Sequence, residues 1–178
     1  MDFGAPVVLT SGLRDGSLRA VAAKKGVPIV LYEAGEGLRF DEMAVRAGVA
    51  GILRVMRGQN MLPAKGIASA KTTPHLCSNS HWLRAPAGGL LRTFRAEGET
   101  VAKGDLLASV ADPFGAVETD LLADASGILI GRAILPVVNE GDAVFHLAQL
   151  SPRADEGTVD DLVSQLESDP MFDEDEII

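Results

Sequence analysis

The residue best placed to do chemistry in this sequence is Glu33, which directly follows an apolar run. Residues 27–32 carry no charge, and one alanine and two glycines occupy three of the four positions after Glu33. An uncharged apolar run is typical of a strand buried on both faces of a parallel sheet. Ligands of open α/β sheets bind just outside the carboxyl ends of such strands, so Glu33 is a candidate general acid or base. The alternative is that Glu33 only ends the strand or caps the helix that starts near Asp41.

The residues before 27–32 predict a short strand and a helix, which would fix the position of the 27–32 strand. Residues 7–10 are apolar and predict a strand, and Ser17 is a suitable N-cap for a helix over residues 18–25. Together with the run at 27–32 they predict a β-α-β unit with parallel strands. The carboxyl ends of the two strands would then lie at one edge of the sheet.

A second helix is predicted from Asp41 to about Arg57. Its apolar face would consist of Val45, Val49, Ile52, Leu53 and Met56. Two strands and two helices leave too much edge and apolar surface uncovered for an independent α/β domain. We therefore expect residues 1–62 to be the C-terminal remainder of a larger α/β catalytic domain whose beginning is absent.

Residues 63–80 are polar and small, and they predict a linker or an exposed loop. Cys77, the single cysteine, would be an incidental thiol there, and it excludes an internal disulfide framework. A lone thiol fits a reducing cytoplasm, and no apolar run approaches the ~20 residues that a membrane span needs. His75 and His81 are a weak metal signal without a third ligand, so solvated or structural roles are favoured.

Residues 81–150 have the pattern of a small β module. Four candidate strands, at 90–94, 106–110, 127–130 and 143–147, are separated by Gly, Asp and Pro turns. A Gly-Asp turn precedes an apolar strand twice, at 104–105 and at 141–142. Two related halves of about 35 residues indicate a small pseudo-symmetric barrel.

The module resembles the biotinyl/lipoyl barrel-sandwich modules, which carry their cofactor on a lysine of the hairpin between the halves. The matching hairpin here, residues 112–118, has no lysine, and Lys103 belongs to a different turn. The resemblance therefore implies a structural or capping role for the module, without biotin or lipoate.

The net charge of −9 is concentrated in residues 151–178, which hold ten acidic residues and one basic residue. These residues predict a disordered acidic tail, with a docking peptide as the alternative. Residues 1–150 are near neutral and have no basic stripe, so we expect no nucleic-acid partner.

The chain as a whole resembles the C-terminal part of succinylglutamate desuccinylase/aspartoacylase family proteins, over about residues 3–150. The segments that carry the resemblance are 11–18, 31–36 and 80–90. It implies the end of a zinc-carboxypeptidase-like α/β domain followed by a barrel-sandwich β module, in an enzyme that hydrolyses N-acyl amino acids or related amides. Glu33 matches the family's general acid/base, which works with a zinc-bound water. Arg14 and Arg84 are candidates for holding a substrate carboxylate, and a solvated or salt-bridged role is the alternative for each.

The sequence departs from the family in its metal ligands. The family's zinc is held by a His-x-x-Glu pair and a later histidine, but no His-x-x-Glu occurs here and no histidine precedes His75. Two hypotheses follow: a chain whose hydrolase activity needs upstream sequence, or a non-catalytic β module with an acidic tail for assembly or partner binding. A homo-oligomer is compatible with both.

Overall fold

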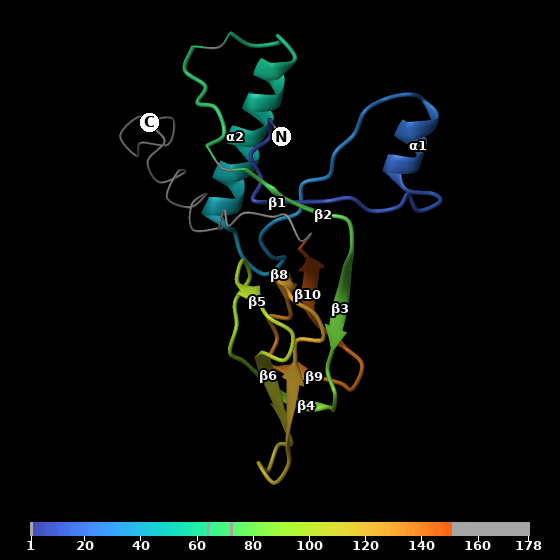
Figure 1. Ribbon diagram of the computed structural model, residues 1–178, viewed down its shortest axis with the longest axis vertical. Helices are drawn as coiled ribbons and strands as arrows, with labels where there is room; N and C mark the ends of the chain where they lie inside the picture. The colour runs from blue at the N-terminus through green and yellow to red at the C-terminus, as the bar shows by residue number, and fades with distance from the viewer. Residues whose placement is uncertain (1, 64, 72, 151–178) are drawn as a thin grey trace. The chain divides into compact units, whose positions relative to one another are not determined.

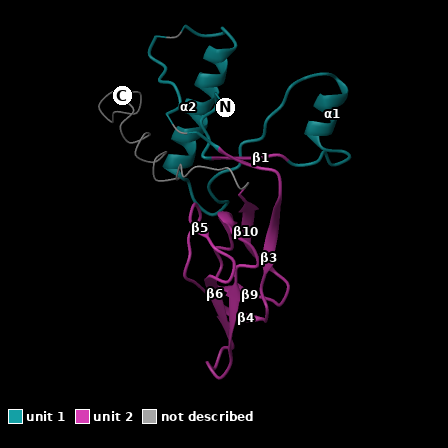
Figure 2. Ribbon diagram, viewed as in Figure 1, with its two compact units in different colours: residues 1–6, 11–74, 161–178 teal, residues 7–10, 75–160 magenta. Residues whose placement is uncertain are grey.

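The computed structural model describes residues 2–63, 65–71 and 73–150 (Figure 1). The predicted acidic tail, 151–178, lies outside the described residues. The chain divides into two compact units (Figure 2). Within the described residues, unit 1 comprises 2–6 and 11–74, and unit 2 comprises 7–10 and 75–150. None of the helices in the described part combines the length and hydropathy that a bilayer-spanning segment requires.

Unit 1 contains the two predicted helices, which begin at the residues expected to cap them. The first, α1 (Leu18–Lys24), begins after Ser17, whose hydroxyl accepts a hydrogen bond from the Ala20 amide at 3.2 Å. The second, α2 (Glu42–Gly58), begins after Asp41, whose carboxylate accepts from the Ala44 amide at 2.9 Å. Side-chain acceptors at these positions satisfy amides that have no partner within the helix.

The prediction of a strand over residues 27–32 is wrong. Residues 27–34 have no regular secondary structure, and the exposed fractions of Val30 and Leu31 are 81% and 65%. No backbone–backbone hydrogen bond joins residues 28–33 to another described residue. A strand forms only where a neighbour pairs its backbone groups, and the described residues of unit 1 contribute two helices and no strand. The predicted β-α-β unit is therefore not formed.

The packed face of α2 also differs from the prediction. Val45, Val49 and Ile52 are 42%, 43% and 57% exposed, although they were expected to be buried. The buried positions are the small residues and one arginine on another side of the helix, namely Gly48, Ala50, Gly51 and Arg54. Apolar periodicity marks a face that can be buried, but which face is covered depends on what the rest of the fold supplies.

Unit 2 begins with a parallel pair, β1 (Val7–Leu9) and β2 (His75–Cys77). The strand expected at 7–10 is confirmed, but its partner is β2 rather than residues 27–32. The linker prediction for 63–80 is therefore wrong at β2, where His75 is 6% and Cys77 2% exposed. Cys77 is not an incidental loop thiol, and its burial raises its pKa.

The remainder of unit 2 is two antiparallel sheets of four strands each. In sheet order, the first contains β3 (Ser80–Arg84), β10 (Ala143–Gln149), β8 (Gly127–Arg132) and β5 (Thr100–Val101). The second contains β7 (Glu118–Leu122), β6 (Leu106–Ala111), β4 (Gly89–Thr93) and β9 (Val137–Val138). All four strands predicted in this region are confirmed.

Both sheets contribute to one hydrophobic core, which lies within unit 2. Leu107 from β6, Leu129 from β8, and Phe145 and Leu147 from β10 are each 0% exposed. Apolar side chains of two sheets that face each other in this way exclude water from the space between them. Unit 2 thus has a core of its own.

The two halves of unit 2 repeat their turns and their tightest backbone contacts. In the first turn Asp105 accepts a hydrogen bond from the Ala102 amide (3.1 Å), and Gly104 has φ +94°. In the second turn Asp142 accepts from the Asn139 amide (2.8 Å), and Gly141 has φ +86°. The same carboxylate bond and the same left-handed glycine therefore recur, in agreement with the repeat seen in the sequence.

The two halves of unit 2 also share a place where one strand's glycine lies very close to a carbonyl group of the neighbouring strand. A Cβ added to Gly89 would lie 2.2 Å from the Ala111 carbonyl oxygen, and one added to Gly127 would lie 2.3 Å from that of Ala148. Each glycine begins a strand, β4 or β8, and each carbonyl lies at or near the end of β6 or β10. Glycine is required at both places because no side chain fits there.

We expect Gly127→Ala to lower the free energy of unfolding of unit 2 by about 2–3 kcal/mol, because the new methyl group would overlap a backbone carbonyl. Gly131→Ala, in the same strand, is the matched control, since its Cβ would meet nothing closer than 3.6 Å. It should leave stability within about 1 kcal/mol or raise it slightly. Urea unfolding of the two variants and the parent measures the difference. Equal urea midpoints for Gly127→Ala and Gly131→Ala would contradict the predicted overlap with the Ala148 carbonyl oxygen.

Candidate active site

Glu33 lies in the exposed stretch of unit 1 that was expected to be a strand. Its side chain makes no hydrogen bond or ion pair with another described residue. The prediction that it leaves a buried strand at the carboxyl edge of a sheet is therefore not met in this chain. The structure does place the residues on both sides of Glu33 close to α2, with a hydrogen bond at Tyr32.

The first of these residues is Tyr32, which lies against α2. Its hydroxyl donates a hydrogen bond to the Ala44 carbonyl at 2.8 Å. A Cβ on Gly48 would lie 3.0 Å from the tyrosine ring, so the absence of a side chain at Gly48 lets the ring lie close to the helix. The ring also contacts Phe3, with 5.1 Å between centroids. The residue next to Glu33 is thus tied to α2 by a polar and an apolar contact.

The backbone also comes close to the start of α2 at Gly35, two residues after Glu33. Gly35 has φ +70°, and a Cβ there would lie 3.3 Å from that of Asp41, the N-cap of α2. Glu36, the other carboxylate of the segment, forms an ion pair with Arg39. Glu33 therefore lies between Tyr32, which is hydrogen-bonded to α2, and Gly35, which lies close to the N-cap of α2, while Glu36 is already paired.

The sequence reasoning missed Tyr32 and Asp41 as residues that position Glu33. A signal was available, because Gly48 and Gly51 cost helix propensity and mark places where something lies close to the helix. The prediction was that these glycines let α2 approach a sheet. In the structure they face aromatic rings instead, with Gly51 against Phe3 and Gly48 against Tyr32.

The two arginines proposed for substrate binding lie in different units and have different surroundings. Arg14, in unit 1, is exposed, and no hydrogen bond or ion pair joins its side chain to Glu33 or to another described residue. Arg84, in unit 2, donates a hydrogen bond from Nη1 to the Gly141 carbonyl at 2.7 Å. Arg84 is thus partly engaged in holding a turn of unit 2, and Arg14 keeps all its donors available to solvent.

The histidines do not form a metal site with the described residues around them. The Nε2 atom of His81 lies 2.8 Å from a carboxylate oxygen of Asp124, which is a structural pairing. His75 is buried in β2. Among residues 2–63, 65–71 and 73–150, no group of three or more His, Cys, Asp or Glu side chains could hold a metal ion. The zinc implied by the family resemblance therefore does not fit the residues described.

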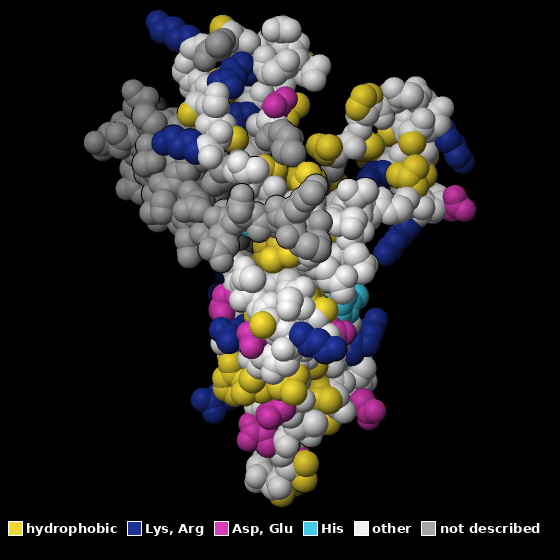
Figure 3. Space-filling view, in the orientation of Figure 1, with side chains coloured by type: hydrophobic (Ala, Val, Ile, Leu, Met, Phe, Trp, Pro, Cys, Tyr) yellow, Lys and Arg dark blue, Asp and Glu magenta, His cyan; other side chains and the backbone are white. Residues whose placement is uncertain are grey.

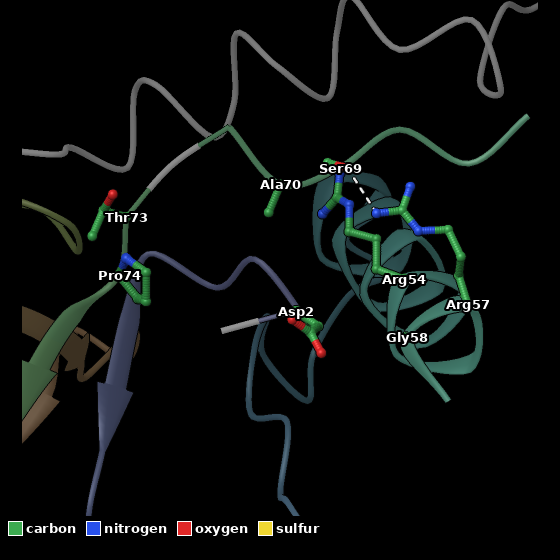
Figure 4. Close-up of a pocket in the computed structure, with 8 residues that line it drawn as sticks. All are labelled: Asp2, Arg54, Arg57, Gly58, Ser69, Ala70, Thr73 and Pro74. Carbon is green, nitrogen blue, oxygen red and sulfur yellow. Dashed lines mark hydrogen bonds between the residues drawn. The ribbon is translucent and has the colours of Figure 1, made fainter. Parts of the chain in front are cut away.

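A pocket of about 380 Å³ in unit 1 lies away from Glu33, on the C-terminal half of α2 (Figure 4). Arg54 and Arg57 point into it, but both guanidinium groups bind the neighbouring segment. Arg54 donates to the Ala68 carbonyl at 3.1 Å, and Arg57 donates to the Ile67 carbonyl at 2.5 Å and to the Ser69 hydroxyl at 2.7 Å. These bonds hold the segment around residues 67–69 against α2. The pocket is lined by Asp2, Arg54, Arg57, Gly58, Ser69, Ala70, Thr73 and Pro74.

Tyr32 provides a direct test of the contacts beside Glu33, because it is the only tyrosine in the chain. Burial, and to a smaller extent the nearby Asp41 carboxylate, raise its pKa above the ordinary value of 10.0. Asp41→Asn keeps an N-cap but removes the charge, so it should lower the Tyr32 pKa part of the way toward 10.0. Ultraviolet titration of the tyrosinate band measures this pKa in both proteins.

The sign of the pH effect on stability follows from the raised pKa. Folding favours the neutral phenol, so this contribution to stability is complete below the unfolded pKa and is lost as the pH rises through the folded pKa. A Tyr32 pKa that stays the same or rises in Asp41→Asn would contradict the proposed contact with the carboxylate.

Comparisons with known proteins place this geometry in a known fold. No family model matches the sequence, and no curated protein matches it. Among solved structures, the ectoine utilization protein EutE (DoeB) from Ruegeria pomeroyi, in its product-bound form, matches with 23% identity and a TM-score of 0.72. That match covers 83% of this chain and 46% of EutE.

Two further matches carry the family's name. A succinylglutamate desuccinylase/aspartoacylase from Rhodobacter sphaeroides matches with 20% identity and a TM-score of 0.63, covering 86% of this chain and 48% of that protein. A succinylglutamate desuccinylase from Silicibacter sp. TM1040 matches with 20% identity and a TM-score of 0.65, covering 84% and 47%. The chain thus spans less than half the length of these proteins. Over that span it has the fold of the succinylglutamate desuccinylase/aspartoacylase family proteins.

Proposed function

We infer that this chain is the C-terminal portion of a zinc-dependent hydrolase that acts on linear amides, with N-acyl amino acids as the substrate class. The observation that carries the proposal is the structural match over 83–86% of the chain to desuccinylase/aspartoacylase-type proteins. The match covers only 46–48% of those proteins, which supports a portion of a longer enzyme.

Glu33 is the residue of this chain to which we assign the chemistry, as general acid/base. A general base must reach the proton of the attacking water, and a carboxylate already paired with an arginine would compete with that role. Glu33 makes no such pair with a described residue, whereas Glu36 does. The contacts of the adjacent Tyr32 with α2 and Phe3 support a defined position for it. In this role Glu33 accepts a proton from the attacking water and returns it to the leaving amine.

The zinc ligands would lie outside the described residues, because no group of three or more His, Cys, Asp or Glu among those residues could hold a metal ion. Arg14 remains the better candidate of the two arginines for a substrate carboxylate, since its guanidinium donors are not used within the described structure. A guanidinium binds a carboxylate with two parallel hydrogen bonds, which would fix the amino-acid end of the substrate.

We also infer that unit 2 is a barrel-sandwich module. The repeat of the Asp105 and Asp142 turns and of the Gly89 and Gly127 contacts supports two equivalent halves. The β6–β7 hairpin between them contains no lysine, so we expect an intact mass without biotin or lipoate.

The hydrolase proposal is tested with a joined protein, in which the part of Ruegeria EutE outside the matched region is fused ahead of residue 1 of this chain. Zinc-dependent release of the amine from N-acyl amino acids is the expected result. A joined protein that is folded and loaded with zinc, yet hydrolyses no N-acyl amino acid of a broad panel, would overturn the proposal. The 178-residue chain alone is the control and should release no amine.

A further inference from the structure

The described residues of unit 1 and unit 2 carry net charges of opposite sign. Unit 1 has ten basic and six acidic residues, a net charge of +4, whereas unit 2 has five basic and nine acidic residues, a net charge of −4. The acidic tail, residues 151–178, has ten acidic residues and one basic residue, a net charge of −9. Charges act on one another over about 10 Å at moderate ionic strength, so unit 1 attracts the tail and unit 2 repels it.

The positive charge of unit 1 is concentrated in residues 43–74, which we call the basic segment. It contains five basic residues and no acidic residue, and Figure 3 shows Lys and Arg side chains gathered at the surface over α2. Arg46 already forms an ion pair with Glu42, which precedes the segment. Lys65 and Lys71, from the part of the segment that follows α2, are both exposed. Like charges that lie close together stabilise an anion placed among them.

Two charges of the basic segment meet in the pocket on the C-terminal half of α2 (Figure 4). Arg54, which is only 3% exposed, and Arg57 both line this pocket. The acceptors that the two guanidinium groups have within the described structure, three backbone carbonyls and one hydroxyl, are neutral. Among the described lining residues Asp2 is the only acid, so the walls carry more positive than negative charge. A carboxylate is a complementary ligand, because guanidinium groups bind it through charge-assisted hydrogen bonds.

We propose that the pocket and the basic segment around it bind carboxylates of the acidic tail of the same chain. The tail supplies ten carboxylates on one covalent tether, so its effective concentration at the pocket reaches the millimolar range and individually weak ion pairs suffice. Its length permits the contact, since 28 residues can span up to about 95 Å, well beyond the diameter of a small domain. The tail is then a docking peptide, and this role does not depend on the proposed hydrolase activity.

Carbodiimide cross-linking of the full 178-residue chain tests the proposal, because this reagent joins a carboxylate to an amine that lies within ion-pair distance. The chain has five lysines, all of them exposed, namely Lys24, Lys25, Lys65, Lys71 and Lys103. At low ionic strength we expect each of Lys65 and Lys71 to form at least ~5-fold more cross-links with the tail than each of the other three. Mass spectrometry of the digested protein measures the yields.

Arg57→Gln removes one charge of the pocket without changing a lysine, and Arg19→Gln is the matched control. Each arginine donates a hydrogen bond to a serine hydroxyl, Arg57 to Ser69 at 2.7 Å and Arg19 to Ser11 at 2.9 Å, so the two changes remove comparable contacts. We expect Arg57→Gln to lower the cross-links at the two lysines of the basic segment at least ~3-fold, and Arg19→Gln to leave them unchanged. Circular dichroism checks the folding of both variants.

The distribution of cross-links in the parent chain decides the proposal even where a variant fails to fold. Equal yields at all five lysines would overturn it, as would yields that persist in 1 M sodium chloride, where charges are screened beyond about 3 Å. Equal losses in two folded variants would also overturn it. Cross-links between isotope-labelled and unlabelled chains would assign the contact to a second copy and overturn binding within the chain.

The joined protein shows whether the contact exists beside the rest of a longer enzyme. We expect the same preference for Lys65 and Lys71 there. A preference that is lost in the joined protein would mean that the other half covers the basic segment, and it would overturn the proposal. None of these measurements reads activity, so the absence of hydrolysis in the joined protein would contradict the proposed function and leave the tail contact standing.

Discussion

Replacement of Glu33 by glutamine in the joined protein is expected to lower kcat at least ~100-fold, with folding and zinc content unchanged. Glutamine keeps the size and polarity of the side chain but can neither accept nor return the proton. The exposure of Glu33 and its lack of a described partner mean that no contact within the described structure is lost. Steady-state kinetics with an N-acyl amino acid, together with metal analysis and circular dichroism, measure the three quantities.

Glu36→Gln is the matched control for this prediction. It makes the same chemical change three residues later, in a carboxylate that is ion-paired with Arg39. We expect its kcat to stay within a few-fold of the parent. Glu33→Gln with full activity, or equal losses in the two variants, would remove Glu33 as the general acid/base.

The second large effect is expected at Phe145, at the centre of the unit 2 core. Its side chain is 0% exposed, and Phe145→Ala should lower the free energy of unfolding by about 3–5 kcal/mol through lost burial and the cavity left behind. A loss of that size is a large part of the roughly 5–15 kcal/mol that stabilises an ordinary domain. Urea unfolding followed by circular dichroism measures it.

Phe114→Ala makes the same substitution at the tip of the β6–β7 hairpin, where the side chain is 94% exposed. Its effect on stability should stay within about 0.5 kcal/mol. Midpoints that fall equally in the two variants would show that the hairpin tip, and not only Phe145, belongs to the core.

The elements that could be predicted from the sequence are those specified by local chemistry. Ser17 and Asp41 accept hydrogen bonds from helix amides three residues later, so both helices begin where the caps indicated. The Gly-Asp turns carry their own geometry, with a left-handed glycine and a carboxylate bond across three residues. These features depend on neighbours in sequence, and they are visible without knowledge of the rest of the fold.

The elements that could not be predicted depend on partners distant in sequence. The pattern of residues 27–32 indicates a strand, but the described chain supplies nothing for it to pair with. The strand at His75–Cys77 is only three residues long and has no apolar run, so its pairing with Val7–Leu9 left no local signal. The same holds for α2, where Gly48 and Gly51 are buried instead of the valines of the predicted face. They are buried because the rings of Tyr32 and Phe3 lie against them.

The candidate site was only partly accessible from the sequence for the same reason. Glu33 could be selected as a strand-end carboxylate. Its surroundings could not, because the Tyr32–Ala44 hydrogen bond spans twelve residues and Gly35 lies close to Asp41 six residues later. Arg14 and Arg84 could be named by residue type alone, and their surroundings could not be, namely a side chain without a described partner at Arg14 and a bond to the Gly141 carbonyl at Arg84.

The unpaired 27–32 segment also has a consequence for solubility. A short, uncharged segment of high β-propensity with free backbone groups is a template for pairing with identical copies of itself, which leads to aggregates. Pro28 interrupts such pairing near one end, and charged residues flank the segment, with Lys24 and Lys25 before it and Glu33 after it. Proline and charges at these places act as gatekeepers against aggregation. By this argument we expect the Glu33 carboxylate to oppose self-association of the exposed segment, apart from any part it has in proton transfer.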